Sequence, residues 1–156
     1  FIGANQVADM DFGAQEHGFD LGLEVQAGLG YDFGRFRIEG MYGRSGSDFE
    51  NTTTDSGFVD LISSTWVGNV LVDFSNDSKF TTSVGVGIGS TKHEITGFDD
   101  TVLNTDLIAG VAYKIADNSY LDMKYTYRIY DDITFGDIKI SDESSQSLLA
   151  GLRFAF

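Results

Sequence analysis

The chain has no cysteine and no proline among its 156 residues, and only 10 of them are lysine or arginine. Without cysteine it forms no disulfide and has no thiolate metal site, and cysteine usage cannot identify the redox compartment. Without proline, no strand is interrupted by a residue that lacks a backbone N–H. The 24 aspartates and glutamates leave a net charge of -14, which argues against nucleic acid as a partner because phosphates need a basic face.

Long apolar runs are also missing. No stretch approaches the ~18 continuous apolar residues that a membrane-spanning helix requires, and no basic segment followed by an apolar one opens the chain as a signal peptide would. The chain begins at Phe1 in what reads as a strand, so we expect a mature protein from which a signal peptide has been removed. Its length predicts a single domain, residues 1–156.

Apolar and polar residues instead alternate with the period of a β-strand. In the last ten residues, Leu148, Leu152 and Phe156 share one face, and Ser147 and Arg153 lie on the other. The same pattern predicts eight strands, at about 1–8, 18–33, 35–45, 58–74, 80–93, 102–115, 119–130 and 147–156.

Tight turns and long polar loops alternate between these strands, with the loops at 9–17, 46–57, 94–101 and 131–143. All long loops therefore lie at one end of an antiparallel meander, and the tight turns lie at the other end with both termini. The predicted fold class is all-β, an eight-stranded antiparallel up-and-down barrel.

The alternation alone leaves open which face is interior. A soluble, lipocalin-like barrel turns its apolar face inward around a ligand, whereas a membrane barrel turns it outward to lipid. Here the polar face is rich in small residues and carries charges of both signs, which fit a narrow interior. Aromatic residues cluster at the strand ends, as the girdles of a membrane barrel do. We therefore predict a transmembrane barrel.

The charged residues of the polar face are predicted to meet inside this barrel. Side chains just fill the interior of an eight-stranded barrel, so we expect a salt-bridged plug rather than the alternative, a narrow channel for ions or small solutes. The predicted network is Glu24, Arg37, Glu39, Asp106, Lys114, Asp122, Lys124, Arg128 and Arg153, and its expected centre is Glu24, Arg37, Glu39, Lys124, Arg128 and Arg153.

Several segments together resemble one family. They are G-L-G-Y-D-F-G-R-F-R-I-E-G-M-Y at 28–42, N-V-L-V-D-F at 69–74, G-V-G-I-G at 85–89, Y-L-D-M-K-Y-T-Y-R at 120–128 and the terminal G-L-R-F-A-F. The chain resembles the opacity-porin and outer membrane protein A-like family of eight-stranded Gram-negative outer membrane β-barrels. This resemblance implies a place in the bacterial outer membrane, with extracellular long loops and periplasmic turns and termini. It also implies that Leu152, Phe154 and Phe156 are a signal for the barrel-assembly machinery.

Two cations stand apart from the interior set. Arg44 and Lys92 point outward by parity, just above the apolar band on the loop side, and we predict that they contact the phosphates of lipopolysaccharide. The loops are acidic and are expected to face solvent, where they would meet a surface ligand or a larger outer membrane assembly.

Little in the sequence indicates catalysis. The two histidines, His17 and His93, are expected to be solvated rim residues rather than part of a catalytic set. No cofactor and no metal site is predicted, and the loop carboxylates do not match the spacing of an EF-hand. The predicted role is structural, membrane-stabilising or surface-recognition of the adhesion type, and not enzymatic.

Overall fold

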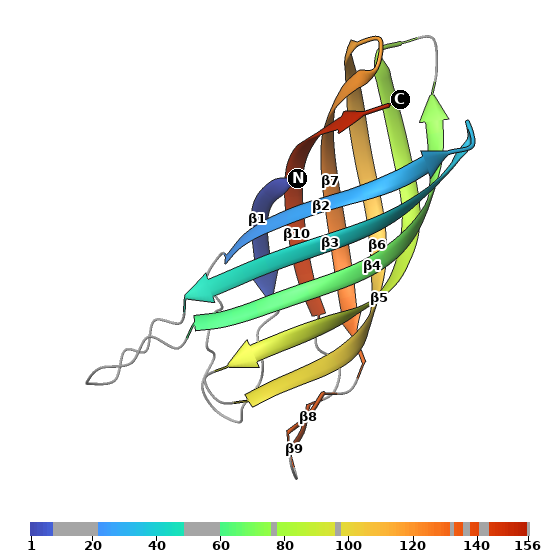
Figure 1. Cartoon of the computed structure of the whole chain (residues 1–156). Coiled ribbons are helices and arrows are strands. Elements are labelled where there is room, and N and C mark those ends of the chain that lie inside the picture. The colour runs from blue at the N-terminus through green and yellow to red at the C-terminus, as the bar shows by residue number, and fades with distance from the viewer. Residues whose placement is uncertain are drawn as a thin grey trace.

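The computed structural model describes residues 1–7, 22–48, 60–75, 78–95, 98–131, 133–135, 138–140 and 144–155. Within these residues eight strands form a closed barrel in the order β1-β10-β7-β6-β5-β4-β3-β2 (Figure 1). They are β1 Ile2–Val7, β2 Gly22–Asp32, β3 Phe36–Asp48, β4 Asp60–Ser75, β5 Phe80–Ile95, β6 Phe98–Ala116, β7 Ser119–Tyr130 and β10 Ser144–Phe154. The predicted up-and-down barrel is confirmed.

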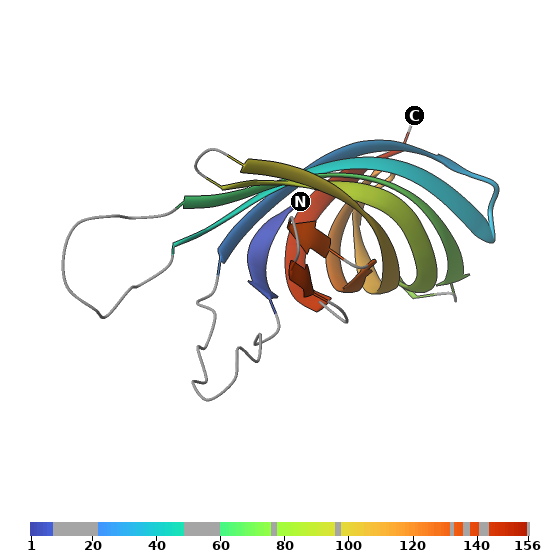
Figure 2. The same ribbon diagram turned by 90° about the horizontal axis from the view of Figure 1, so that it is seen from below.

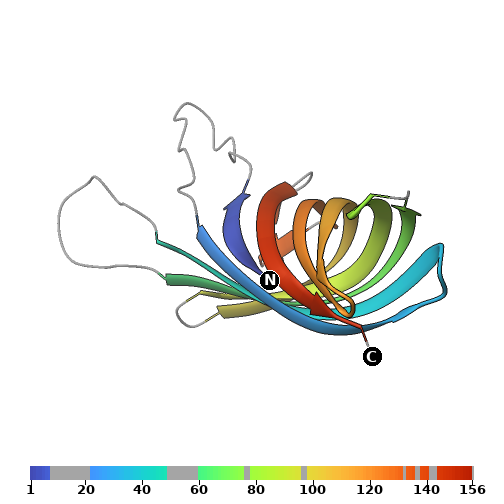
Figure 3. The same cartoon turned by 90° about the horizontal axis from the view of Figure 1, so that it is seen from above.

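The barrel closes where β1 pairs with β10, in the register Ile2↔Ala150 to Val7↔Ser145. β1 also pairs with β2, from Ile2↔Val25 to Asn5↔Gly22. Views along the barrel from its two ends show the strands curving around one common interior (Figures 2 and 3). Among the residues described, no helix is long and apolar enough to span a membrane.

Three parts of the predicted loops are strands instead. β3 continues to Asp48, into the loop predicted at 46–57. β5 and β6 remain paired as far as Ile95↔Phe98, so the loop predicted at 94–101 is wrong. A separate hairpin, β8 Ile133–Phe135 with β9 Ile138–Ile140, lies within the loop predicted at 131–143. Beyond the apolar band, a strand no longer has a polar interior on one side and an apolar surrounding on the other, so its polar and apolar residues stop alternating. Its backbone hydrogen bonds to the neighbouring strand continue. Strands of three residues are too short for periodicity to reveal.

The tight turn between β2 and β3 agrees with its prediction. Gly34 has a φ of 94°, in the left-handed region that glycine enters without steric cost. The Gly34 N–H donates to Asp32 Oδ1 at 2.7 Å, and the Phe33 N–H donates to the Phe36 carbonyl at 2.8 Å. The turn thereby sets the register Asp32↔Arg37 with which β2 and β3 begin to pair.

The polar face lies inside and the apolar face outside. In β2, Glu24 is 2% exposed and its neighbours Leu23 and Val25 are 59% and 48% exposed. This contradicts the lipocalin-like alternative, in which the apolar face would line the interior. Some apolar side chains also pack inside among the polar ones, at positions whose parity places them on the polar face: Met41, Val67, Leu71, Ile108 and Leu149.

Outward aromatic rings gather near the two ends of the apolar band. At the turn end the exposed rings are Tyr31, Phe33, Phe36, Phe74, Phe80 and Phe154. At the loop end Trp66 is exposed and pairs with Tyr42, with 4.7 Å between ring centroids. Phe19 and Phe156, two aromatic residues near the ends of predicted strands, lie outside the described residues.

Glycines relieve crowding where strands meet inside. A Cβ on Gly87 would clash with Asn69 Oδ1 and lie 3.0 Å from Val67 Cγ2. Gly68 of β4 faces outward, and a Cβ there would meet only the Ile88 carbonyl, at 3.9 Å. The two glycines therefore have different reasons to lack a side chain, and only Gly87 is required by packing.

We expect Gly87→Ala to destabilise the barrel by about 1–3 kcal/mol, because the methyl group overfills the interior. The matched Gly68→Ala is expected to leave stability unchanged or slightly raised, since alanine restricts the unfolded chain. Urea unfolding of both variants in the same detergent micelles measures the difference. Equal effects of the two substitutions would contradict the packing role of Gly87.

Candidate functional site

The polar interior holds three groups of interacting side chains, and the first lies toward the tight turns. Arg37 of β3 makes ion pairs with Asp73 of β4 and Glu39 of its own strand: Nη1 lies 2.6 Å from Asp73 Oδ2, and Nε lies 2.8 Å from Glu39 Oε1. Arg37 and Asp73 come from paired strands, and parity directs both inward. All three side chains are at least 89% buried.

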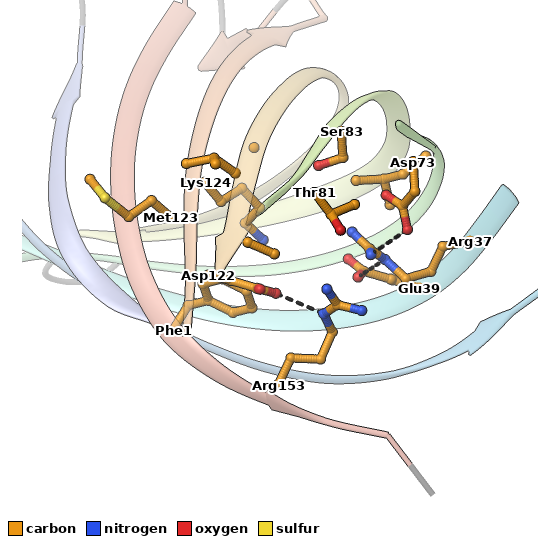
Figure 4. A pocket seen from close by; sticks show the side chains of 14 residues that line it. Phe1, Arg37, Glu39, Asp73, Thr81, Ser83, Asp122, Met123, Lys124 and Arg153 are labelled. Atoms are coloured by element: carbon orange, nitrogen blue, oxygen red, sulfur yellow. Dashed lines mark hydrogen bonds and ion pairs between the residues drawn. The ribbon is translucent and has the colours of Figure 1, made fainter. Parts of the chain in front are cut away.

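A second ion pair faces this one across the interior (Figure 4). Arg153 of β10 donates from Nε to Asp122 Oδ2 of β7 at 2.8 Å. Its guanidinium also lies 4.4 Å from the centroid of the Tyr120 ring, where a cation is attracted to the ring face. Arg37, Glu39, Asp73, Asp122 and Arg153 form what we call the turn-side cluster.

The second group crosses from β1 to β7 near the middle of the barrel. Asn5 Nδ2 donates to Glu24 Oε2 at 2.9 Å, and Gln26 Nε2 donates to Glu24 Oε1 at 2.6 Å. Lys124 Nζ donates to Gln26 Oε1 at 2.6 Å and lies 4.5 Å above the Phe1 ring. The neutral Gln26 amide thus connects the carboxylate of Glu24 to the ammonium of Lys124, and we call this group the central relay.

The third group, the loop-side ring, joins β4, β5, β6 and β7. Arg128 binds Asp106 through two bonds, Nε to Oδ1 at 2.8 Å and Nη2 to Oδ2 at 2.7 Å. Asn104 donates to Asp106 Oδ1 at 2.8 Å, and Thr91 donates to Asn104 Oδ1 at 3.1 Å. Thr65 lies 2.9 Å from Thr91 and accepts from Arg128 Nη1 at 3.4 Å, so the hydrogen bonds return to Arg128.

Eight of the nine charged residues predicted for the interior belong to these groups, and Lys114 does not. Its side chain is 42% exposed, and its Nζ lies 3.6 Å from Asp117 of the adjoining turn. Lys114 stands at the end of β6, next to a break in register between Lys114 and Ala116. At this position the inward-facing side chain of Lys114 lies at the open end of the barrel.

Sequence reasoning missed Asp73 as a partner and also missed the neutral members of the network. Asp73 follows the inward parity of Thr65 and Asn69 in β4, so its position in the strand was the signal that could have added it. The network was predicted from charged residues, so it left out the neutral members Asn5, Gln26, Thr65, Thr91 and Asn104. They are all buried, which leaves their polar groups dependent on one another.

The turn-side cluster and Lys124 surround a cavity of about 20 Å³, also lined by Phe1, Thr81 and Ser83 (Figure 4). A buried water needs roughly 10–15 Å³ of such volume, so the cavity has room for about one. Asp73 Oδ1 and Asp122 Oδ1 are buried without a hydrogen-bond partner, and a water there could donate to them. At this level charged side chains, rather than open solvent, occupy the interior.

The predicted outward cations lie in one row across three strands. Arg44 pairs with Ser64, and Ser64 pairs with Lys92. Arg44 is exposed and Lys92 is half-buried. Of the predicted assembly signal, Leu152 and Phe154 are 56% and 64% exposed on the outward face, and Phe156 lies outside the described residues.

The sequence predicted that His93 is a solvated rim residue, and this prediction is wrong. His93 is half-buried, with Nδ1 2.8 Å from Ser63 Oγ and its ring 5.4 Å from that of Tyr130. Its parity matches that of the inward Thr91, which explains the position. His17 lies outside the described residues. In the described part of the chain, no group of three or more His, Cys, Asp or Glu is arranged to hold a metal ion.

One family model and one solved structure with a similar fold agree with this architecture. The family model described as "Outer membrane protein beta-barrel domain" matches residues 2–154, whereas no curated protein matches the sequence. The chain is similar to the crystal structure of Neisserial surface protein A, with a TM-score of 0.76 and 19% identity over 99% of this chain and 93% of that one. Ail, the attachment invasion locus protein of Yersinia pestis, has 19% identity over 98% and 95% of the two chains, with a TM-score of 0.46.

The Arg128–Asp106 pair offers a direct test of the interior network. Arg128→Met is expected to cost about 3–5 kcal/mol, because it leaves the buried Asp106 carboxylate without its counter-charge. The double variant Arg128→Met, Asp106→Asn should be more stable than the single one, because the remaining charge is also removed. Urea unfolding in micelles measures both.

Lys114→Met serves as the matched control. Lys114 lies in β6, as Asp106 does, but its side chain is half-exposed and only weakly paired. The stability of this variant should equal that of the unmodified protein. A loss in Lys114→Met as large as that in Arg128→Met would contradict the special role of the buried pair.

Proposed function

The chain belongs to the outer membrane β-barrel family, and on that basis we propose that it is a closed barrel with a structural or surface-recognition role. In this proposal the barrel stabilises the bacterial outer membrane and presents its loops at the cell surface. It neither transports solutes nor catalyses a reaction. The outward apolar face and the two groups of aromatic rings support a position across the bilayer.

The observation that carries the proposal is the filled interior. Three hydrogen-bonded groups cross the barrel at successive levels, and the cavity in the turn-side cluster measures about 20 Å³. A steady ion path would need continuous water along the axis, but at these levels ion pairs and amides take its place. The polar interior of an eight-stranded barrel therefore acts here as a plug.

We place the long loops outside the cell and the tight turns in the periplasm. The loop segments and the strand ends beside them are rich in carboxylates: Asp9, Asp11, Glu16, Asp48, Glu50, Asp55, Glu94, Asp99, Asp100, Asp131, Asp132, Asp137, Asp142 and Glu143. Exposed charge of one sign favours solubility and selects partners of the opposite sign. A surface ligand or a neighbouring membrane protein with a basic face would match these loops.

Because the interior is lined with polar groups, a narrow channel is the second candidate function. Conductance measurements distinguish it from the closed barrel. We expect the pure, refolded protein to give no steady, large conductance steps in planar bilayers, because side chains occupy the axis. Lys124→Ala removes the side chain that reaches Gln26 and should allow small steps. The outward variant Arg44→Gln should remain silent. Steady, large steps from the unmodified protein would overturn the plug and favour the channel.

We also propose that Leu152, Phe154 and Phe156 form the signal read by the barrel-assembly machinery during biogenesis. Deletion of Phe156 is expected to lower the amount of assembled barrel in cells while leaving refolding into detergent nearly unchanged. Heat-modifiable migration on gels measures both, because folded barrels migrate differently from unfolded ones.

Phe33→Ala is the matched control for this deletion. It removes an exposed aromatic ring from the turn between β2 and β3, at the end of the barrel where β10 ends. Normal assembly of Phe33→Ala beside poor assembly of the deletion would support the signal. Equal losses of assembly and of refolding in the deletion would contradict it.

A further inference from the structure

The turn-side cluster carries more negative than positive charge, because it contains three carboxylates and two guanidinium groups. In the central relay and the loop-side ring the charges balance. Arg128 forms an ion pair with Asp106. The Gln26 amide connects Lys124 to Glu24. Since an uncompensated charge is very costly to bury, the turn-side cluster requires one further positive charge.

Asp73 and Asp122 of this cluster each have one carboxylate oxygen that is left over. Asp73 uses Oδ2 for its ion pair with Arg37, at 2.6 Å. Asp122 uses Oδ2 for its ion pair with Arg153, at 2.8 Å. In both residues Oδ1 is buried and has no hydrogen-bond partner within the described part of the chain. The two side chains are 6% and 9% exposed, so bulk water does not satisfy these oxygens.

Both carboxylates line the cavity of about 20 Å³ in the interior (Figure 4). Thr81 and Ser83 of β5 also line it, so their hydroxyl groups add neutral oxygens to its wall. The volume admits about one particle of the size of a water molecule. A water would donate to the two Oδ1 atoms but would bring no charge. A small cation satisfies both requirements, because it is attracted to the oxygens and compensates the extra negative charge.

Two other residues of the cavity wall have positively charged groups, and both groups are engaged elsewhere. Lys124 Nζ donates to Gln26 Oε1 at 2.6 Å and lies 4.5 Å from the centroid of the Phe1 ring. The amino group of Phe1 donates to the Gln26 carbonyl oxygen at 2.8 Å. The ion pairs of Asp73 and Asp122 found in the described ranges involve Arg37 and Arg153. The missing positive charge therefore comes from outside the chain.

We propose that the cavity binds one monovalent cation of the size of Na⁺. The ion contacts Oδ1 of Asp73 and Oδ1 of Asp122, and the hydroxyl oxygens of Thr81 and Ser83 are its further ligands. Oxygen atoms are the ligands that hard cations prefer. One positive charge makes the turn-side cluster neutral, whereas a divalent ion would leave it with a positive charge in excess. The charge balance therefore selects a monovalent ion.

The bound ion joins separate parts of the barrel wall. Asp73 belongs to β4 and Asp122 to β7, and two strands lie between them. The ion pairs of these aspartates extend the connection to β3 and β10. Because the ion binds the folded barrel at a site that the unfolded chain does not form, Na⁺ stabilises the folded state. The site goes beyond the proposed function, since it concerns neither a solute path nor surface recognition.

Thermal unfolding tests the site. The protein is refolded into uncharged detergent micelles in NaCl or in choline chloride at equal ionic strength, since choline is too large for the cavity. We expect Tm to rise saturably with Na⁺, by roughly 3–6 °C at a concentration tenfold above Kd, and to remain unchanged with choline. Broadening of the sodium NMR line by the folded protein reports binding directly. Equal Tm values in the two salts would overturn the site, because water or a proton would then be sufficient.

Asp122→Asn removes the extra negative charge and one ligand oxygen while it keeps the size of the side chain. The difference in Tm between NaCl and choline chloride should disappear in this variant. Asp117→Asn is the matched control, because Asp117 is a fully exposed carboxylate in the turn that precedes the same strand. It should retain the full difference. Persistence of the difference in Asp122→Asn, or its loss in Asp117→Asn, would contradict the site.

Ser83→Ala provides a test that changes no charge, and heat-modifiable migration shows whether each variant is folded. It removes one hydroxyl ligand and should weaken Na⁺ binding about tenfold. If Asp122→Asn does not fold, Ser83→Ala decides, and unchanged Na⁺ affinity in it overturns the site. The bilayer recordings are independent of these measurements. A silent protein without Na⁺ dependence refutes the cation site alone, and steady, large conductance steps from a protein that binds Na⁺ refute the proposed function alone.

Discussion

The structure depends on the requirement that a sheet surrounded by lipid leaves no backbone N–H or C=O unpaired, since no water is present to satisfy it. The pairing of β1 with β10 meets this requirement by joining the first strand to the last. With eight strands, closure produces a narrow interior. That narrowness explains why Gly87 has no side chain, because a Cβ there would overlap Asn69, and why buried charges come within direct reach of their partners.

The narrow interior also determines its electrostatics. A charge that has left water must be compensated by neighbours, or its burial is very costly. Arg128 and Asp106 achieve this with two parallel hydrogen bonds, whereas Glu24 and Lys124 are connected through the neutral Gln26 amide. Because these contacts cross between strands that are distant in sequence, they restrain the barrel as a whole. The space they occupy is space that a solute path would need, so the proposed functions lie on the outer surfaces.

The outward face follows the opposite rule. Its side chains are apolar because they meet lipid, and the exposed aromatic rings define where the apolar band ends. Arg44 departs from this rule at the loop end, beside a groove that Gly46 leaves open.

The amino-acid sequence by itself determined the strands and their faces, because alternation records which side of a strand meets water or polar groups. β7 was predicted with its observed bounds, Ser119–Tyr130, and the inward position of Glu24, Arg37 and Arg128 followed from parity. The sequence did not reveal β8 and β9, or the extension of β5 and β6, since those segments have no alternation to detect.

Only the tertiary structure decided which inward residues meet. Parity assigns a side chain to a face but not to a partner, and partners depend on the stagger between strands that closure imposes. Asp73 therefore became the partner of Arg37, while Lys114 turned to Asp117 at the open end of the barrel. The groove beside Arg44 likewise required the register that brings Leu23, Gly46 and Ile62 side by side, because no single strand contains it.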